Sequence, residues 1–363
     1  MALGKRIGVL TSGGDCAGLN AVLRAVVNRA VAGYGWEVTG IREGTRGLMS
    51  RPVAAEVLLP ADVDSTVLRQ GGTILGTTNK GNPFAYPGDD GSTRDRSEEV
   101  IEGYRMLGLD ALIGIGGDGS LAILKRLADQ GGLNLVAVPK TIDNDLSRTE
   151  VSVGYPTAVD TATMALDHLQ PTAASHSRIM VLEVMGRDAG HIALAAGIAG
   201  GADIILIPEI PYDMAALAGK ILRLQEGGRN FALVIVAEAV RTESGEPVVH
   251  RHAGGGAVNY GGIGHYIAGR LAEETGAETR VTVLGHLQRG GMPSARDRLM
   301  ASVFGVHAVD LIAQGRFNRM VAWSDRQVVD VPIVEGLAAY QGVEVEGSLV
   351  DTARGLGISF GDG

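Results

Sequence analysis

Seven short apolar runs, each closed by glycine or polar residues, restrict most strongly what this chain can fold into. The runs are apolar throughout instead of alternating with polar residues, which is typical of strands covered on both faces. Segments with helical spacing separate them, so strand and helix alternate along the chain. The sequence therefore predicts an α/β fold with mainly parallel sheets. The predicted strands are 5–10, 111–117, 133–139, 178–184, 202–208, 231–238 and 280–285.

The chain is predicted to form two Rossmann-like domains. The first takes residues 1–153 plus about 289–340, and the second takes 154–288 plus the C-terminal tail. Helical spacing is clearest in 18–33, which ends at Gly33, and in 120–130, which ends before Gly131. Ligands of such sheets bind at the carboxyl ends of the strands, so we expect the active site in the cleft between the two domains.

The composition narrows the class of protein. The only cysteine is Cys16, which rules out a disulfide within the chain and favours a reducing cytoplasm. The N-terminus enters a strand-like run at once and leaves no room for a signal peptide. No apolar run reaches the roughly 18–20 residues of a membrane span. A formal net charge of −9 without a long Lys/Arg run argues against nucleic acid as a partner.

Two glycine-rich loops follow predicted strands. The first glycine loop, T-S-G-G-D-C-A-G-L-N (11–20), opens a helix, so its backbone N–H groups can converge on a phosphate. It matches neither a Walker A motif nor a strict G-x-G-x-x-G, and a plain strand-to-helix turn is the alternative. The second glycine loop, G-I-G-G-D-G-S (114–120), contains Asp118. A carboxylate beside phosphate requires a metal, so we interpret Asp118 as a Mg²⁺ ligand, with a helix N-cap as the alternative.

The third strand end is P-K-T-I-D-N-D (139–145), called here the aspartate loop. Asp143 and Asp145 are two residues apart, so they share a face if the chain is extended there. A hydroxyl that attacks phosphorus must lose its proton, and an aspartate within reach is the usual acceptor. The alternative is an Asx-rich turn in which Asn144 and Asp145 satisfy their own backbone.

A basic set flanks strands of the second domain. Arginine forks suit phosphate oxygens, so the set favours a second phosphate site, although each arginine alone is more often a solvated surface residue. Glu238 ends another predicted strand and can accept hydrogen bonds from sugar hydroxyls or cap a helix. The set consists of Arg178, Arg187, Arg280, His286 and Arg289.

Together these residues resemble the 6-phosphofructokinase family over nearly the whole chain, from residue 5 to about 320. The motif G-G-D-G-S alone is weak evidence for this family, because related lipid and dinucleotide kinases share similar loops. The whole set of motifs in this order is specific for it. The motifs are T-S-G-G-D-C-A-G-L-N (11–20), G-G-T-I-L-G-T (71–77), G-G-D-G-S (116–120), P-K-T-I-D-N-D (139–145), V-M-G-R-D-A-G (184–190), V-A-E (236–238) and V-L-G-H-L-Q-R-G-G (283–291).

The resemblance implies phosphoryl transfer from ATP to the 1-hydroxyl of fructose 6-phosphate, giving fructose 1,6-bisphosphate and ADP in glycolysis. It implies that Asp143 is the base, that Gly14 and Arg187 also act in catalysis, and that Asp118 holds Mg²⁺. The first domain would bind the donor and the second fructose 6-phosphate. The implied donor contacts are Gly14, Gly117, Asp118, Gly119, Ser120, Lys80 and Lys140. The implied sugar-phosphate contacts are Thr141, Asp145, Met185, Gly186, Arg187, Glu238, His286 and Arg289.

The resemblance further implies that Arg178 and Arg280 reach the 6-phosphate from a neighbouring subunit. That sharing requires a homo-oligomer, most often a tetramer built as a dimer of dimers in this family.

The phosphoryl donor depends on two positions. Lys140 is like the pyrophosphate-dependent members of the family, which typically carry an aspartate where this chain has Gly119. A side chain at 119 would enter the space of the α-phosphate of a nucleotide, and glycine leaves that space open. We therefore expect ATP, with a pyrophosphate-dependent enzyme as the main alternative and a non-catalytic nucleotide or sugar-phosphate sensor as a remoter one. A dinucleotide oxidoreductase is disfavoured because neither loop has the strict fingerprint.

Overall fold

The computed structural model describes residues 4–88, 90–249 and 260–363. The chain divides into two compact units. Unit 1 contains Met1–Ile142, Leu146–Thr157 and Arg289–Tyr340, and unit 2 contains Asp143–Asp145, Ala158–Gln288 and Gln341–Gly363. The chain therefore passes more than once between the units, and each is described separately below.

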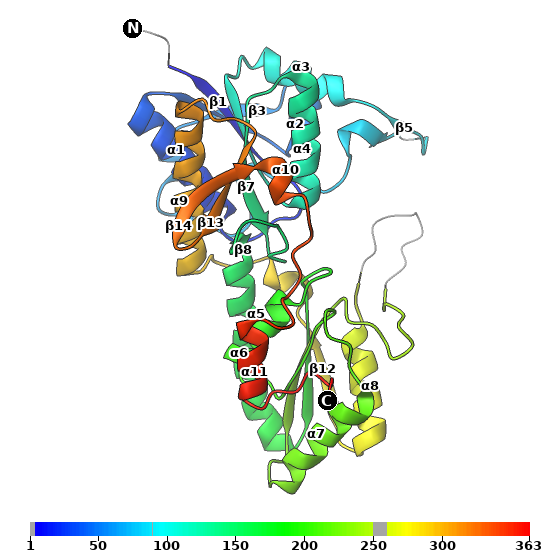
Figure 1. The fold of residues 1–363 in the computed structure, drawn as a ribbon. Helices are drawn as coiled ribbons and strands as arrows, with labels where there is room; N and C mark the ends of the chain where they lie inside the picture. Colours follow the sequence, from blue (N-terminus) through cyan, green and yellow to red (C-terminus); the bar gives the residue numbers. More distant parts are fainter. Residues whose placement is uncertain (1–3, 89, 250–259) are drawn as a thin grey trace. The chain divides into compact units, whose positions relative to one another are not determined.

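Unit 1 is built on an eight-stranded sheet, coloured from blue through orange in Figure 1 because its strands come from distant parts of the chain. The strand order is β14-β13-β7-β6-β1-β2-β3, with β8 paired to β7. Neighbouring strands are parallel except for the pairs β2–β3 and β13–β14. The strands are β1 (Arg6–Thr11), β2 (Glu37–Ile41), β3 (Ala55–Leu58), β6 (Ala111–Gly116), β7 (Leu135–Thr141), β8 (Val153–Gly154), β13 (Arg319–Ser324) and β14 (Gln327–Pro332).

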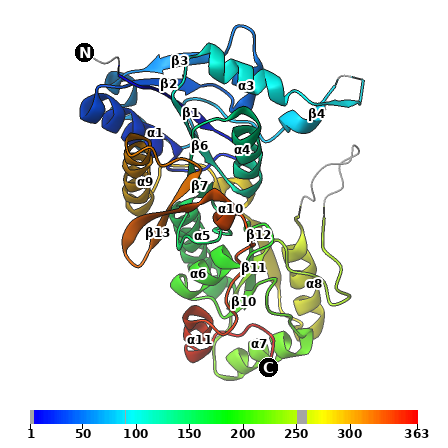
Figure 2. The same ribbon diagram turned by 45° about the horizontal axis from the view of Figure 1, so that its top comes forward.

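Helices cover both faces of this sheet (Figures 1 and 2). Helices α1 and α9 pack on each other over one face, while α2, α3 and α4 lie over the other. The apolar residues of the central strands are therefore enclosed on both sides, as their unbroken hydrophobicity predicted. The helices are α1 (Leu19–Asn28), α2 (Thr45–Met49), α3 (Ser97–Met106), α4 (Asp118–Gly131), α9 (Ala295–Ala313) and α10 (Ile333–Gly336). A small ribbon, β4 (Tyr86–Pro87) and β5 (Thr93–Arg94), lies apart from the sheet.

The two helices expected from the sequence are present, with one difference in how they end. Helix α1 continues through a π-helical turn, Arg29–Gly33, so the predicted end at Gly33 is confirmed. Helix α4 ends at Gly131, but Gly132 is the left-handed cap, with φ 65°. A Cβ on Gly131 would lie 2.8 Å from Ile101 of α3, so glycine there serves close helix packing instead.

Unit 2 is a smaller α/β unit with a four-stranded, entirely parallel sheet in the order β10-β11-β9-β12. Helices α6 and α11 cover one face, and α7 and α8 cover the other (Figures 1 and 2). The strands are β9 (Ile179–Val184), β10 (Ile204–Leu206), β11 (Ala232–Ala237) and β12 (Thr279–Val283). The helices are α5 (Tyr155–His176), which begins in unit 1, α6 (His191–Ala199), α7 (Met214–Glu226), α8 (Ile263–Thr275) and α11 (Ser348–Gly355).

The predicted fold class, α/β with mainly parallel sheets, is confirmed, and each of the seven predicted strands is present. Of the strands in the unit 1 sheet, the sequence pattern missed β2, β3, β8, β13 and β14. Strands β3 and β14 are only partly buried, so they lack the unbroken apolar run that identified the others. No helix in the described ranges combines the length and hydropathy that crossing a bilayer requires.

A buried carboxylate, Asp297 near the start of α9, holds the segment of unit 1 that leads into α5. Its side chain is fully buried and accepts hydrogen bonds from the backbone N–H of Gly154 at 2.8 Å and of Thr157 at 2.9 Å. The hydroxyl of Thr157 donates to the same carboxylate. Ser294 caps α9 by accepting from the N–H of Asp297 at 3.2 Å. One aspartate therefore joins α9 to β8 and to the first turn of α5.

We predict that Asp297→Ala lowers the free energy of unfolding by roughly 3 kcal/mol or more, because it leaves several buried donors without an acceptor. The matched control is Asp129→Ala. Asp129 is exposed and pairs only at the surface of α4 with Lys125, so its loss should stay within about 0.5 kcal/mol. Urea denaturation of the two variants measures both values. Equal destabilisation by both substitutions would contradict the role given to Asp297.

Candidate active site

Three neighbouring strands of unit 1 deliver their following loops to one edge of the sheet. Strands β7, β6 and β1 are adjacent and parallel, so their carboxyl ends meet at that edge. The first glycine loop follows β1, the second glycine loop closes β6, and the aspartate loop closes β7. The sheet thus assembles the three segments that the sequence singled out.

The first glycine loop lies against the second one. Ser12 N–H donates to the carbonyl of Ile115 at 2.9 Å, and Gly13 N–H donates to the carbonyl of Thr78 at 3.0 Å. Gly13 has φ 85°, and a Cβ there would lie 2.8 Å from Oγ of Ser120. Position 13 therefore requires glycine both for its left-handed backbone and for the close approach of the second loop.

A buried lysine lies where the loops meet. The Lys140 side chain is 4% exposed, and its ammonium donates to the carbonyl of Gly14. The same nitrogen would lie 3.4 Å from a Cβ on Gly13. A buried ammonium is stable only when charge-assisted hydrogen bonds offset its desolvation. The arrangement puts a positive charge beside the backbone N–H groups of the first glycine loop, which favours an anion there.

Asp118 and Gly119 lie at the N-terminus of α4, and both are exposed. The N-cap of α4 is Gly117, so the alternative that Asp118 caps the helix is not observed. A Cβ on Gly119 would meet no atom within 4 Å, so glycine at 119 is not needed for packing. In the described ranges no three His, Cys, Asp or Glu residues gather as a metal site, so Asp118 is not part of a protein-only cage.

The aspartate loop turns sharply after β7 ends at Thr141. Asn144 has φ 54°, so the extended conformation that would give Asp143 and Asp145 a common face is not present. Asparagine tolerates this left-handed region better than most residues. Asp143 is 8% exposed and Asp145 5% exposed, so both carboxyl groups are largely withdrawn from bulk water.

Two residues predicted to contact the substrates flank these loops in unit 1. Arg289 donates from Nη1 to the carbonyl of Asp15 at 3.0 Å, and a Cβ on Gly14 would lie 2.7 Å from that nitrogen. The structure thus places Arg289 against the first glycine loop. Lys80 is exposed, and its backbone N–H donates to the hydroxyl of Thr78 at 3.1 Å.

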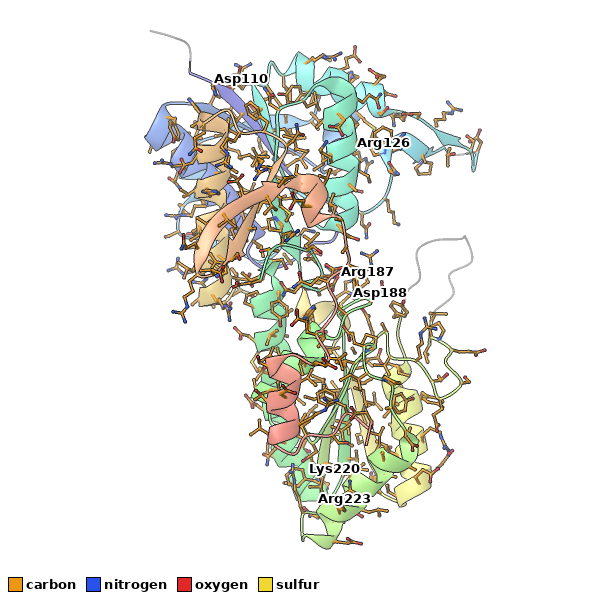
Figure 3. All side chains as sticks on the ribbon, in the orientation of Figure 1. Asp110, Arg126, Arg187, Asp188, Lys220 and Arg223 are labelled. Carbon is orange, nitrogen blue, oxygen red and sulfur yellow. The ribbon has the colours of Figure 1, made fainter. Side chains whose placement is uncertain are left out.

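In unit 2 the structure brings together the turn after β9, residues 185–187, and Glu238, which follows the adjacent strand β11. Oε1 of Glu238 accepts from the N–H of Gly186 at 3.3 Å and from that of Arg187 at 2.9 Å. Both amides belong to a turn that precedes the start of α6 at His191, so Glu238 does not cap a helix there. The Arg187 side chain is exposed, and its Nε lies 3.8 Å from the carboxylate of Asp188, beside which it is labelled in Figure 3.

Burial raises the pKa of Glu238 to about 7. The amides of Arg187 and Gly186 oppose this by stabilising the charged form, while the negative charge of Asp143 adds to it. Glu238 and Asp143 therefore interact electrostatically within unit 2. A carboxyl group that titrates near neutrality in such a cluster is typical of a functional site.

Gln288 is a residue of this site that the sequence analysis missed. Its side chain is fully buried, and Oε1 accepts from the N–H of Met185 at 2.8 Å. It lies in the short 3₁₀ helix Gly285–Gln288, which also carries the exposed His286. The one signal in the sequence was an amide side chain within H-L-Q-R-G-G (286–291), between two residues that were selected.

Arg178 and Arg280 lie at the other edge of the unit 2 sheet. Arg178 precedes β9, and Arg280 is the second residue of β12, whereas the 185–187 turn follows β9. The six residues of β9 separate the two edges by about 20 Å. Both arginines pair with Glu278, with Arg178 Nε 3.1 Å from its Oε2. Within one chain they do not join the group formed by the 185–187 turn and Glu238.

The chain is similar to known proteins along its whole length. A family model described as Phosphofructokinase matches residues 6–312. The chain is 64% identical to ATP-dependent 6-phosphofructokinase 1 of Synechocystis sp., covering 99% of both chains. It is 61% identical to ATP-dependent 6-phosphofructokinase 1 of Nostoc sp., covering 100% of both. The crystal structure of Pichia pastoris phosphofructokinase in the T-state matches with a TM-score of 0.80 and 31% identity, covering 99% of this chain and 38% of the Pichia chain.

The chain thus spans less than half of the Pichia protein but nearly all of the two bacterial relatives. The range matched by the family model contains both glycine loops, the aspartate loop, the 185–187 turn and Gln288. The two glycine loops follow strands of the unit 1 sheet, and the 185–187 turn follows a strand of the unit 2 sheet. On its sequence and on its fold, the chain belongs to the phosphofructokinase family.

Proposed function

We propose that this chain transfers the terminal phosphoryl group of ATP to the 1-hydroxyl of fructose 6-phosphate. The products are fructose 1,6-bisphosphate and ADP, so the enzyme acts in glycolysis. The observation that carries this proposal is the identity of more than 60% to two ATP-dependent 6-phosphofructokinases over nearly their full lengths. The geometry of the loops in both units supports it.

Unit 1 is proposed to bind the donor. Backbone N–H groups of the first glycine loop, with Gly14 closest, would hold the terminal phosphates next to the Lys140 ammonium. The loop at the N-terminus of α4 would hold the rest of the triphosphate at a helix end that favours anions. Its contacts would be Gly117, Asp118, Gly119 and Ser120. The exposed Lys80 would be a further contact, in a segment that meets the first glycine loop through the hydrogen bond from Gly13 N–H to the carbonyl of Thr78.

Asp118 is proposed to hold Mg²⁺. Its exposed carboxylate stands at the start of α4, and in the described residues no three His, Cys, Asp or Glu side chains gather as a metal site. That fits Mg²⁺, which usually takes one or two carboxylates and completes its shell with substrate phosphates and water. When bound, the ion would neutralise charge on the donor phosphates.

Unit 2 is proposed to bind fructose 6-phosphate and to supply the base. Asp143 would take the proton from the 1-hydroxyl as that oxygen attacks the terminal phosphorus and ADP leaves. Arg187 would stabilise the negative charge of the transferred group. The remaining proposed contacts to the sugar phosphate are Asp145, Met185, Gly186, Glu238 and His286 of unit 2 together with Thr141 and Arg289 of unit 1.

Arg178 and Arg280 are proposed to bind the 6-phosphate of a substrate held by a neighbouring subunit. In this chain they lie at the edge of the sheet away from the 185–187 turn, so their contribution to that site requires a second copy. The proposal therefore includes a homo-oligomer. Because the chain has a single cysteine, Cys16, and is proposed to act in glycolysis, we propose that it acts in the cytoplasm.

ATP is favoured over pyrophosphate by the space at Gly119. A Cβ there would meet nothing within 4 Å, and we propose that the α-phosphate of a nucleotide uses this open space. Lys140 can contact a phosphate of either donor and does not discriminate between them.

We predict turnover of fructose 6-phosphate with Mg²⁺ and ATP and none with Mg²⁺ and pyrophosphate. Formation of fructose 1,6-bisphosphate, followed by a coupled assay, measures both. Turnover with pyrophosphate alone would reverse the choice of donor. Absence of turnover with either donor, with binding of ATP or sugar phosphate retained, would favour the sensor.

We predict that Asp143→Asn lowers kcat by about 10²–10⁴-fold, because the amide cannot accept the proton. KM for both substrates should stay within about twofold, since the side chain keeps its size. The control Asp325→Asn, on an exposed turn, should leave both constants unchanged. A loss of less than tenfold in kcat for Asp143→Asn would remove this residue as the base.

We predict that Gly119→Asp raises KM for ATP by at least about tenfold, because a carboxylate would face the phosphates of the nucleotide. The substitution should not lower the melting temperature, since the site is open and an acidic residue suits the first turn of a helix. Gly119→Asn is the neutral control of equal size, and Gly119→Ala is the smaller one. If all three variants bound ATP like the wild type, Gly119 would not determine the donor.

A further inference from the structure

Three consecutive backbone amides of the 185–187 turn are held by side chains from other parts of unit 2. Met185 N–H donates to Gln288 at 2.8 Å, and the next two N–H groups donate to Glu238 at 3.3 and 2.9 Å. None of the three amides is used by the sheet, because β9 ends at Val184. The turn therefore depends on side chains for its conformation.

Two residues of this turn have backbone angles that are unfavourable for most amino acids. Gly186 has φ 152°, and a Cβ there would lie 2.5 Å from the carbonyl oxygen of Ala189. Arg187 has φ 52°, in the left-handed region that residues other than glycine seldom occupy. Such strain persists only where surrounding contacts fix the backbone, and it is concentrated at functional sites.

Gln288 is poorly explained as a packing residue. It is fully buried, but only its oxygen is used in the described parts of the chain, while its Nε2 has no hydrogen-bond partner there. An unsatisfied buried N–H group is unfavourable, and an apolar side chain of similar length would avoid that cost. What the glutamine supplies that an apolar side chain cannot is the acceptor for Met185.

We propose that Gln288 is a positioning residue which, together with Glu238, holds the three amides of the 185–187 turn so that the turn is formed before fructose 6-phosphate binds. This inference rests on the proposed function, in which the turn contacts the sugar phosphate. Gln288 itself does not touch the substrate. Its effect is expressed through the backbone that carries Arg187.

The test is Gln288→Met, which keeps the length of the side chain and removes the acceptor. KM for fructose 6-phosphate should rise by about five- to tenfold, the worth of one hydrogen bond. kcat and KM for ATP should change less than twofold, and the melting temperature should not fall, because the unpaired Nε2 is removed as well. Gln225→Met, on the exposed face of α7, is the matched control and should change none of these.

A second measurement needs neither substrate nor activity. Deuterium uptake by a peptide covering 184–190 should be faster in Gln288→Met than in the wild type, while peptides from β11 and α8 exchange alike. In the wild type, uptake by this peptide should also be faster at pH 6 than at pH 8, once it is corrected for the pH dependence of the intrinsic exchange rate. The reason is that protonation of Glu238 weakens its acceptor oxygens. In Glu238→Gln, which accepts at every pH, the difference should disappear.

The proposal is overturned if Gln288→Met changes neither KM for fructose 6-phosphate nor the exchange of the 184–190 peptide. It is also overturned if the variant raises both KM values and lowers the melting temperature together, since that is the result of general structural damage. Failure of the proposed function looks different. In that case the wild type itself does not turn over fructose 6-phosphate, while the exchange measurements still report whether Gln288 and Glu238 hold the turn.

Discussion

The hydrogen bond from the Lys140 ammonium to the carbonyl of Gly14 is the interaction on which the arrangement of unit 1 depends. A charge this deeply buried must be bonded, so its position at the end of β7 commits the first glycine loop to lie beside it. Gly13 then has to approach Ser120, which brings the second glycine loop to the same place. The Lys140 ammonium thus lies where the first glycine loop meets the second one, at the place where we propose that phosphate binds.

In unit 2 the conformation of the loop at the sheet edge is fixed by side-chain acceptors and not by a cation. Its 185–187 turn presents N–H groups that no strand or helix satisfies, and Glu238 and Gln288 accept from them. Glu238 directly follows β11, and Gln288 is the last residue of the 3₁₀ helix Gly285–Gln288. In each unit, therefore, the sheet supplies the framework, and one or two buried polar side chains determine the conformation of the loop at its edge.

The sequence predicted the parts of this structure that follow from hydrophobic periodicity. Unbroken apolar runs identified the central strands of both sheets, and polar residues at their ends identified the loops. Backbone conformations that depend on tertiary contacts could not be predicted from this periodicity. Nothing local distinguishes Asn144 with φ 54° from an extended asparagine, and nothing local shows that Gln288 accepts from an amide about a hundred residues earlier in the chain. Arg178 and Arg280 lie at the opposite edge of the sheet because β9 and β12 run parallel and both residues are near the strand starts. The motif residues alone do not show strand direction.

The choice of donor illustrates how a residue can be informative because it has no structural role. Gly13 is required by its backbone angle and its neighbour, so its presence says little about the ligand. Gly119 has an ordinary helical backbone and open space where a side chain would go, and a helix N-terminus would accept an aspartate readily. Folding therefore gives no reason for glycine at 119. We propose that the reason is a ligand that uses this space, and a nucleotide, which extends beyond the phosphates common to both donors, is such a ligand.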